Sequence, residues 1–100
     1  MAKISEDFIV ENGCLKSYIG NDADVIIPDT VVEIDEYAFD NCKNVISITI
    51  PESVLKINDY AFYCRNLTTV TLSNNIKEIG MDIFDGCIKL STFIFPDGIS

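Results

Sequence analysis

The residues of this chain that could support chemistry are four cysteines and 16 carboxylates. The chain contains no histidine. Cys14, Cys42, Cys64 and Cys87 stand at least 22 residues apart, whereas structural zinc sites use close pairs such as C-x2-C. Without histidine, the chain lacks the commonest general base and the usual activator of a nucleophile. Residues 21–24 (NDAD) lack the order of a calcium loop. We therefore expect no catalytic residue, no metal and no cofactor, and predict that the protein is not an enzyme.

The charge balance points to a protein partner rather than to nucleic acid. The chain has 16 acidic and seven basic residues, a net charge of −9, and ten of the acids lie in residues 1–40. Direct nucleic-acid binding requires clustered Lys and Arg, which this sequence does not offer. No apolar run approaches the roughly 18–20 residues of a membrane span. A basic protein partner is compatible with this charge, although acidity also serves solubility alone.

The cysteines belong to a repeat, so they indicate architecture rather than chemistry. Cys42, Cys64 and Cys87 are spaced by 22 and 23 residues, and a parallel series of phenylalanines is spaced by 23 and 22 residues: Phe39, Phe62 and Phe84. A fixed period of 20–29 residues with apolar positions in register is typical of a repeat protein. We expect the phenylalanines to stack in one column and the cysteines in a second, as free buried thiols.

Each repeat divides into two local patterns. The first alternates apolar and polar residues, as in VISITI (45–50), LTTVTL (67–72) and LSTFIF (90–95), which predicts a strand with one buried face. The second, VVEIDEYAFDNC (31–42), spaces its apolar residues three to five apart and predicts a turn followed by a short helical segment. Stacked copies would bury a continuous core, with parallel strands on one face.

The segment VISITIPESVLKINDYAFYCRNL (45–67) resembles the BspA-type leucine-rich repeats of bacterial proteins. The resemblance covers residues 22–100, about three and a half repeats. It implies a right-handed leucine-rich repeat solenoid with a parallel β-sheet on one face and short helical turns on the other. It also implies protein binding, since many relatives sit on cell surfaces and adhere to matrix proteins.

The two ends of the chain differ from the repeats. The segment FIVENGCLKSYIG (8–20) places Asn-Gly between two apolar runs, which predicts a β-hairpin. We expect residues 1–21 to form an N-terminal hairpin cap and residues 22–100 the repeats. At the other end the strand 93–95 is followed only by PDGIS. An uncovered strand edge can pair with another chain, so self-association is one alternative; truncation of a longer array is a second, and a natural bare end is the third.

The outward side chains of the predicted strands form the first candidate surface. Strand residues alternate between the two faces of a sheet, so two rows face away from the core. We predict that a partner binds these rows: Asp24, Ser47, Thr69 and Thr92 in one, and Ile26, Thr49, Thr71 and Ile94 in the other. The face lacks the Trp, Tyr or Arg anchors of binding hot spots, so hydroxyl residues that merely suit a solvated strand are the alternative interpretation.

An acidic surface is the second candidate. Its residues are Asp22, Asp29, Glu33, Asp35, Glu36 and Asp40. A small acidic protein can occupy a basic groove in place of a phosphate backbone, with fast and salt-sensitive association. The alternative function is therefore an intracellular inhibitor that occupies the basic groove of a nucleic-acid-binding protein.

The main prediction is a protein-binding module without catalytic activity, either a fragment or a small member of the BspA-like bacterial adhesin and interaction family. The first residues, MAKISEDFIV, do not resemble a signal peptide, which predicts a cytoplasmic location for the chain as written. A cell-surface location is expected instead if the chain is part of a larger secreted protein.

Overall fold

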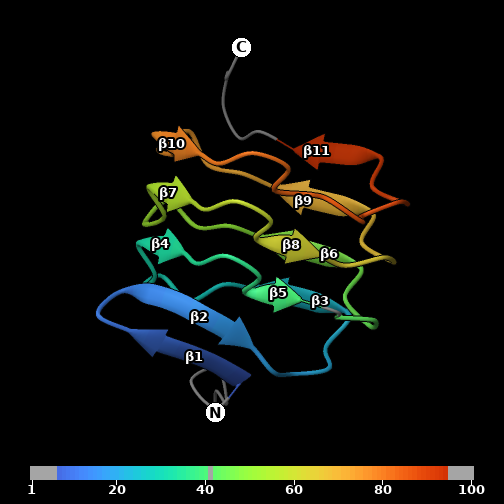
Figure 1. The fold of residues 1–100 in the computed structure, drawn as a ribbon, viewed down its shortest axis with the longest axis horizontal. Helices are drawn as coiled ribbons and strands as arrows, with labels where there is room; N and C mark the ends of the chain where they lie inside the picture. The colour runs from blue at the N-terminus through green and yellow to red at the C-terminus, as the bar shows by residue number, and fades with distance from the viewer. Residues whose placement is uncertain (1–6, 41, 95–100) are drawn as a thin grey trace.

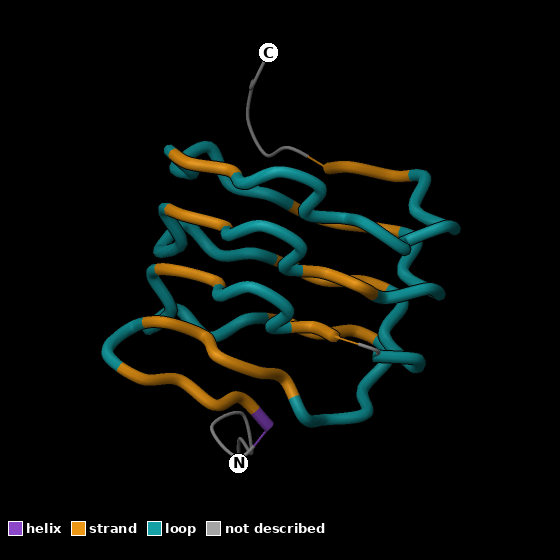
Figure 2. Tube along the Cα trace, in the orientation of Figure 1, coloured by secondary structure: helices purple, strands orange, loops and turns teal. Residues whose placement is uncertain are grey.

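The structure, a computed structural model, describes residues 7–40 and 42–94, which form three β-sheets (Figures 1 and 2). Eleven short strands lie in this part of the chain. Equivalent strands of successive repeats pair in parallel, so the repeats lie in layers one above another. The predicted repeat positions beyond residue 94 lie outside the described residues.

The first sheet has five strands in the order β1-β2-β4-β7-β10. Its strands are β1 (Phe8–Glu11), β2 (Cys14–Tyr18), β4 (Glu33–Ile34), β7 (Lys56–Ile57) and β10 (Glu78–Ile79). Strands β1 and β2 form the predicted antiparallel hairpin. Asn12 and Gly13 at its tip have φ of 51° and 80°, as a turn with two left-handed residues requires. Strand β2 then pairs in parallel with β4, which joins the hairpin to the first repeat.

The other two sheets complete each layer. The second sheet contains β3 (Asp24–Ile26), β6 (Ser47–Thr49), β9 (Thr69–Thr71) and β11 (Thr92–Ile94), all parallel, and it agrees with the strands predicted from alternation. The third sheet contains β5 (Phe39–Asp40) and β8 (Phe62–Tyr63). The chain therefore turns three corners in each of the first two repeats, between one sheet and the next.

The predicted short helical turns opposite the main sheet are wrong. From residue 8 to residue 94, apart from residue 41, the chain forms strands and turns without a helical segment. The backbone N–H of Phe39 donates to the carbonyl of Ala61 in the next repeat (2.9 Å) rather than to a carbonyl four residues back. Tyr37, with φ of 59°, also leaves the helical region of backbone space. The apolar spacing of this segment reflects corners of the chain. No helix among the described residues is long and apolar enough to cross a membrane.

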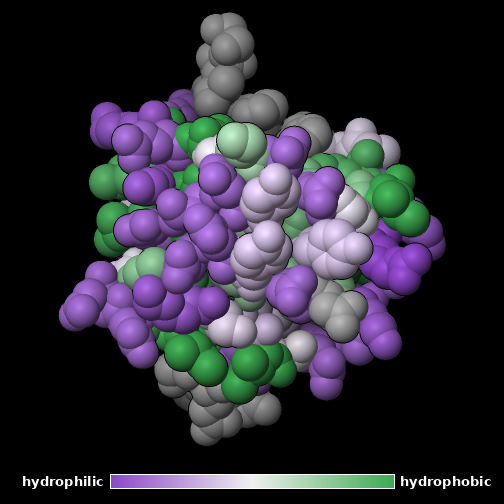
Figure 3. Space-filling model, in the orientation of Figure 1, coloured by the Kyte–Doolittle hydropathy of each residue, from purple (hydrophilic) through white to green (hydrophobic). Residues whose placement is uncertain are grey.

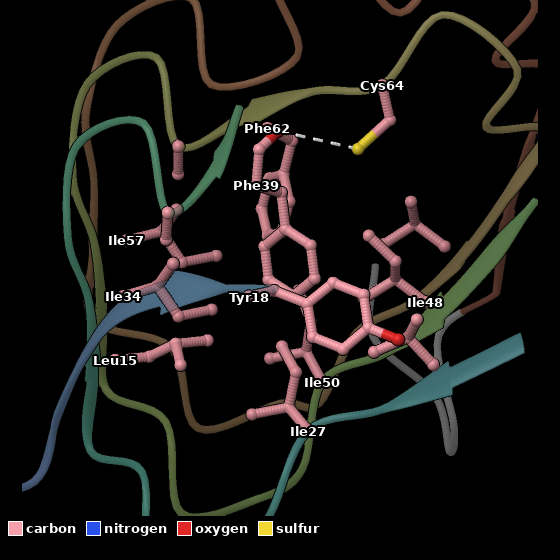
Figure 4. Close-up of a cluster of buried hydrophobic side chains, with 14 of the residues drawn as sticks. Leu15, Tyr18, Ile27, Ile34, Phe39, Ile48, Ile50, Ile57, Phe62 and Cys64 are labelled. Atoms are coloured by element: carbon pink, nitrogen blue, oxygen red, sulfur yellow. Dashed lines mark hydrogen bonds between the residues drawn. The ribbon is translucent and has the colours of Figure 1, made fainter. Parts of the chain in front are cut away.

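The core lies between the three sheets and takes inward side chains from most of their strands, whereas both residues of β10 are exposed (Figure 4). Ile34 and Ile57 of the five-stranded sheet and Ile48 of the four-stranded sheet are at most 1% exposed. Between them stands the predicted phenylalanine column: the centroid of Phe62 lies 5.2 Å from that of Phe39 and 5.3 Å from that of Phe84. Two hairpin residues that the repeat pattern did not include, Tyr18 and Phe8, extend this column downward.

Asparagine side chains link successive layers at the three corners. Asn58 donates to the carbonyl of Ile34 (2.8 Å), Asn66 to that of Lys43 (2.7 Å) and Asn75 to that of Glu52 (2.9 Å). Each bond joins an asparagine side chain at a corner to the main chain of the preceding repeat. The corners are therefore held in place as the sheets are, by bonds between repeats.

Candidate functional site

The four-stranded sheet holds the predicted rows of outward side chains in register. Asp24, Ser47, Thr69 and Thr92 are direct neighbours across β3, β6, β9 and β11, and Ile26, Thr49 and Thr71 form the second row. The intervening residues Val25, Ile48 and Val70 are buried, so the rows face away from the core. Ile94 continues the second row by its backbone position, but its side chain lies outside the described part.

The exposed rows are smooth and weakly polar. Ile26 is 66% exposed, whereas Ser47, Thr49, Thr69 and Thr71 are half-buried by one another. The Ser47 hydroxyl donates to the Asp24 carboxylate (2.7 Å), which fixes the two neighbours relative to each other. Hydroxyl groups in this arrangement offer regularly spaced donors and acceptors to a partner surface. Whether a partner binds these residues stays a prediction.

The structure separates the six predicted acidic residues among different corners. Asp22 precedes β3, and Asp29 lies in the turn between β3 and β4. Glu36 lies in the turn between β4 and β5, and Asp40 is the last residue of β5. Glu33 accepts a hydrogen bond from Asn58 (2.9 Å). The six acids therefore lie at several corners of the coil, and their binding of a basic partner stays a prediction.

Asp35 has local bonding partners that account for its position. Its carboxylate pairs with the Lys16 ammonium at 3.2 Å and accepts the backbone N–H of Glu36 at 2.8 Å. The hydrogen bond and the charge of Asp35 raise the pKa of Lys16. A substitution at Asp35 would therefore disturb the turn as well as the surface charge, so Glu36 and Asp40 are better probes of an acidic surface.

A surface that the sequence analysis missed lies around β5 and β8. The rings of Tyr37 and Tyr60 stack with centroids 5.7 Å apart and planes only 4° apart. Tyr63, 42% exposed, stands opposite Asp40 across the β5–β8 pair, and its ring covers Gly86. Figure 3 views this side of the molecule and shows mostly hydrophilic side chains in its centre. Tyr37 and Tyr60 are 23 residues apart, which is one repeat period, and this spacing could have predicted their stacking.

We call this surface the tyrosine face. It comprises the three tyrosines, Asp40, which stands opposite Tyr63, and the three acids whose charges act on Tyr60: Asp59, Asp82 and Asp85. The negative charge of Asp82, followed by partial burial and the charges of Asp85 and Asp59, raises the pKa of Tyr60. Asp82 occupies the same positive-φ corner as Tyr37 and Tyr60, one layer further along the repeat.

The cysteines form the predicted second column in part. The thiols of Cys64 and Cys87 are buried and donate to the carbonyls of Phe39 (3.6 Å) and Phe62 (3.5 Å), while Cys42 is only half-buried. All four cysteines are free thiols. A hydrogen bond with Cys42 and burial raise the pKa of Cys64, and burial raises that of Cys87. Buried, protonated thiols are poor nucleophiles, which fits a structural role.

Hollows lie at the corners of the described surface. One of about 470 Å³ lies at the corner between β8 and β9, where repeat positions bring together Lys43, Arg65 and Lys89. Another of about 310 Å³ lies between the hairpin and the first repeat, beside Cys42 and Asp40. Among the described residues, no group of three or more His, Cys, Asp or Glu side chains is placed to hold a metal ion.

Comparisons with known proteins agree with the layered repeat. Residues 10–100 match the family described as BspA type Leucine rich repeat region (6 copies). The fold is similar to the crystal structure of a leucine-rich repeat protein from Eubacterium ventriosum, with a TM-score of 0.77 and 26% identity. That similarity covers 94% of this chain and 28% of the other. No curated protein matches the sequence. Since the family match spans most of the described residues, this chain belongs to the BspA-type leucine-rich repeat family.

Proposed function

We propose that the chain is a protein-binding module without catalytic activity, a right-handed solenoid whose four-stranded sheet docks the partner. The observation that carries the proposal is the alignment of Asp24, Ser47, Thr69 and Thr92 into one straight row across four strands. A flat sheet with fixed, short side chains loses little conformational entropy when a partner covers it. This chain corresponds to 28% of the similar leucine-rich repeat structure from Eubacterium ventriosum.

The test is a pair of substitutions that introduce the same bulk and charge at different places. Thr71→Arg lies in the middle of the sheet face, whereas Thr30→Arg lies in an exposed turn outside it. Proteins retained by the immobilised wild-type chain would be identified by mass spectrometry, and their affinity for each variant would then be measured. We expect Thr71→Arg to abolish binding and Thr30→Arg to leave it unchanged. Equal binding by both variants would refute the assignment to the sheet.

The second candidate is the acidic inhibitor of a basic, nucleic-acid-handling protein. It is supported by the net charge of −9 and by exposed carboxylates at Asp22, Asp29, Glu36 and Asp40. Binding of this kind weakens steeply with salt, because exposed charges are screened. Glu36→Lys should weaken it, whereas Thr71→Arg should not. Salt-insensitive binding of the retained protein would exclude this candidate.

A further inference from the structure

The tyrosine face combines flat aromatic surface with negative charge. Residues 34–42, 57–64 and 79–87, which build it, contain six acids and three tyrosines but no Lys or Arg. All seven basic residues of the chain lie in other segments, including Lys16, which pairs with Asp35 from the neighbouring hairpin strand. The face is therefore electrostatically complementary to a cationic ligand.

The tyrosines are held where bulky residues are costly. Tyr37, Tyr60 and Asp82 occupy the same repeat position, with φ of 59°, 57° and 50°. Glycine or asparagine adopts this left-handed conformation readily, whereas a bulky side chain there is strained. The chain nevertheless carries two large aromatic rings at this position, one of them 52% exposed. Strain of this kind, once observed, is a reason to look for function.

We propose that the tyrosine face binds an arginine-bearing segment of a protein partner. A guanidinium is planar, so it can lie flat on a tyrosine ring while donating two parallel hydrogen bonds to a carboxylate. The stacked rings of Tyr37 and Tyr60 supply the flat surface, and Asp82, at the same repeat position in the next layer, supplies the carboxylate. A lysine ammonium has neither the planar shape nor the paired donors, so it fits this site less well.

This inference rests on the proposed function in one respect, namely that the ligand is a protein. The binding surface is the tyrosine face rather than the four-stranded sheet. The outward rows of β3, β6, β9 and β11 lack both aromatic rings and clustered acids. The inference also goes beyond the acidic inhibitor, because charge alone would not distinguish arginine from lysine. Discrimination between these two cations is therefore the property to measure.

The experiment uses two capped peptides of equal length and charge, one of alternating Arg and Gly and one of alternating Lys and Gly. The chain contains no tryptophan, and three of its four tyrosines lie on the proposed site, so intrinsic tyrosine fluorescence reports binding directly. Fluorescence would be titrated at low and raised salt with the full 100-residue chain. We expect the arginine peptide to bind at least about three-fold more tightly than the lysine peptide at both salt concentrations. Equal affinity for the two peptides, or no binding of the arginine peptide, would overturn the proposal.

Variants then locate the binding. Tyr60→Ala removes one ring and should lower the affinity for the arginine peptide about two- to five-fold. Tyr60→Phe keeps the aromatic ring, and its affinity should stay within about two-fold of that of the wild type. Asp82→Asn keeps a residue that tolerates a positive φ and should weaken binding as well. Unchanged affinity in both Tyr60→Ala and Asp82→Asn would overturn the site. Circular dichroism checks that each variant is folded, and Asp82→Asn provides the decisive test if the alanine variant is not.

Two further measurements distinguish the tyrosine face from the sheet face and from self-association. Thr71→Arg, on the sheet face, should leave peptide binding unchanged, so loss of binding there would refute the tyrosine face while sparing the proposed function. Sedimentation of the chain alone tests a second copy as the occupant, since Arg65 is the chain's single arginine. Self-association that Arg65→Gln abolishes would identify a second copy as the ligand and overturn the proposal of a separate partner.

Discussion

The ring of Tyr18, in the hairpin, stacks on the ring of Phe39, in the first repeat, with centroids 5.2 Å apart and planes 25° apart. Below Tyr18, the ring of Phe8 lies 5.0 Å away, so the hairpin adds two rings to the column begun by the repeats. The Tyr18 N–H also donates to the carbonyl of Ala38 (2.9 Å). These contacts give the hairpin the position that a preceding repeat would have, and they cover the lower end of the core.

Loss of the Tyr18 ring should therefore destabilise the whole domain. Tyr18 is 5% exposed, and deleting a buried aromatic ring costs about 3–5 kcal/mol, so Tyr18→Ala should lower the free energy of unfolding by that amount. Tyr18→Phe removes only the hydroxyl, which accepts the N–H of Asp22 (3.2 Å), and should cost about 1 kcal/mol. Urea unfolding followed by circular dichroism measures both. A loss below about 1 kcal/mol for the alanine variant would mean that the hairpin does not cover the core in solution.

The main sheet and the phenylalanine column could be predicted from the sequence, because both depend on strong periodic signals. Alternation in VISITI gave the inward position of Ile48, and the period of 22–23 residues gave the stacking of Phe39 on Phe62. Tyr18 was missed because it lies 21 residues before Phe39, outside the repeat, although its size and aromatic character suit the same position.

The remaining sheets and surfaces could not be predicted, for physical reasons. Strands such as β4 (Glu33–Ile34) and β5 (Phe39–Asp40) have two residues each, too few for alternation to be recognised. They are fixed by bonds to the next repeat, which a local pattern does not contain. Tyr37 has a positive φ, which is incompatible with a helix. Tyrosine rarely adopts a positive φ, so its residue type did not predict this corner. Since these corners decide which acids are neighbours, the sequence alone could not place the acidic residues relative to one another.

The four thiols should separate into two classes by reactivity. Cys14 and Cys42 are partly exposed, whereas Cys64 is fully buried and Cys87 is 9% exposed. The thiolate is the reactive form, and the pKa values of Cys64 and Cys87 are raised; burial and nearby carboxylates raise the pKa of Cys14 too, so exposure rather than pKa separates the two classes. Ellman's reagent at about pH 8 should therefore modify two thiols in the native protein and four after unfolding. Cys42→Ser should leave one reactive thiol in the native state, and rapid modification of all four in the folded chain would contradict the buried column.

Ionisation of Tyr60 should couple stability to alkaline pH. Its pKa is raised above the ordinary value of about 10, chiefly by Asp82, so the unfolded chain loses this proton at lower pH than the folded chain. The contribution to stability is thus fully present below about pH 10 and disappears as pH rises through the raised pKa. Absorbance at about 295 nm measures the titration, and in Asp82→Asn the Tyr60 pKa should fall. An unchanged titration curve in that variant would show that Asp82 does not act on the ring.

At position 37, a glycine variant should be more stable than an alanine variant, which reverses the usual order of their free energies of unfolding. Elsewhere in a strand or helix glycine is less stable than alanine, but at φ of 59° the alanine Cβ is strained and glycine is not. Both variants lose the stack with Tyr60, which is worth about 0.5–1.5 kcal/mol. We therefore expect Tyr37→Ala to be destabilised and Tyr37→Gly to be more stable than the alanine variant by about 0.5–1 kcal/mol, as measured by urea unfolding.

Val32→Ala and Val32→Gly, at an exposed site where no positive φ is found, provide the matched control and should show the ordinary order. If Tyr37→Gly were the less stable of its pair, the left-handed backbone at this position would be wrong, and with it the argument that strain marks the tyrosine face.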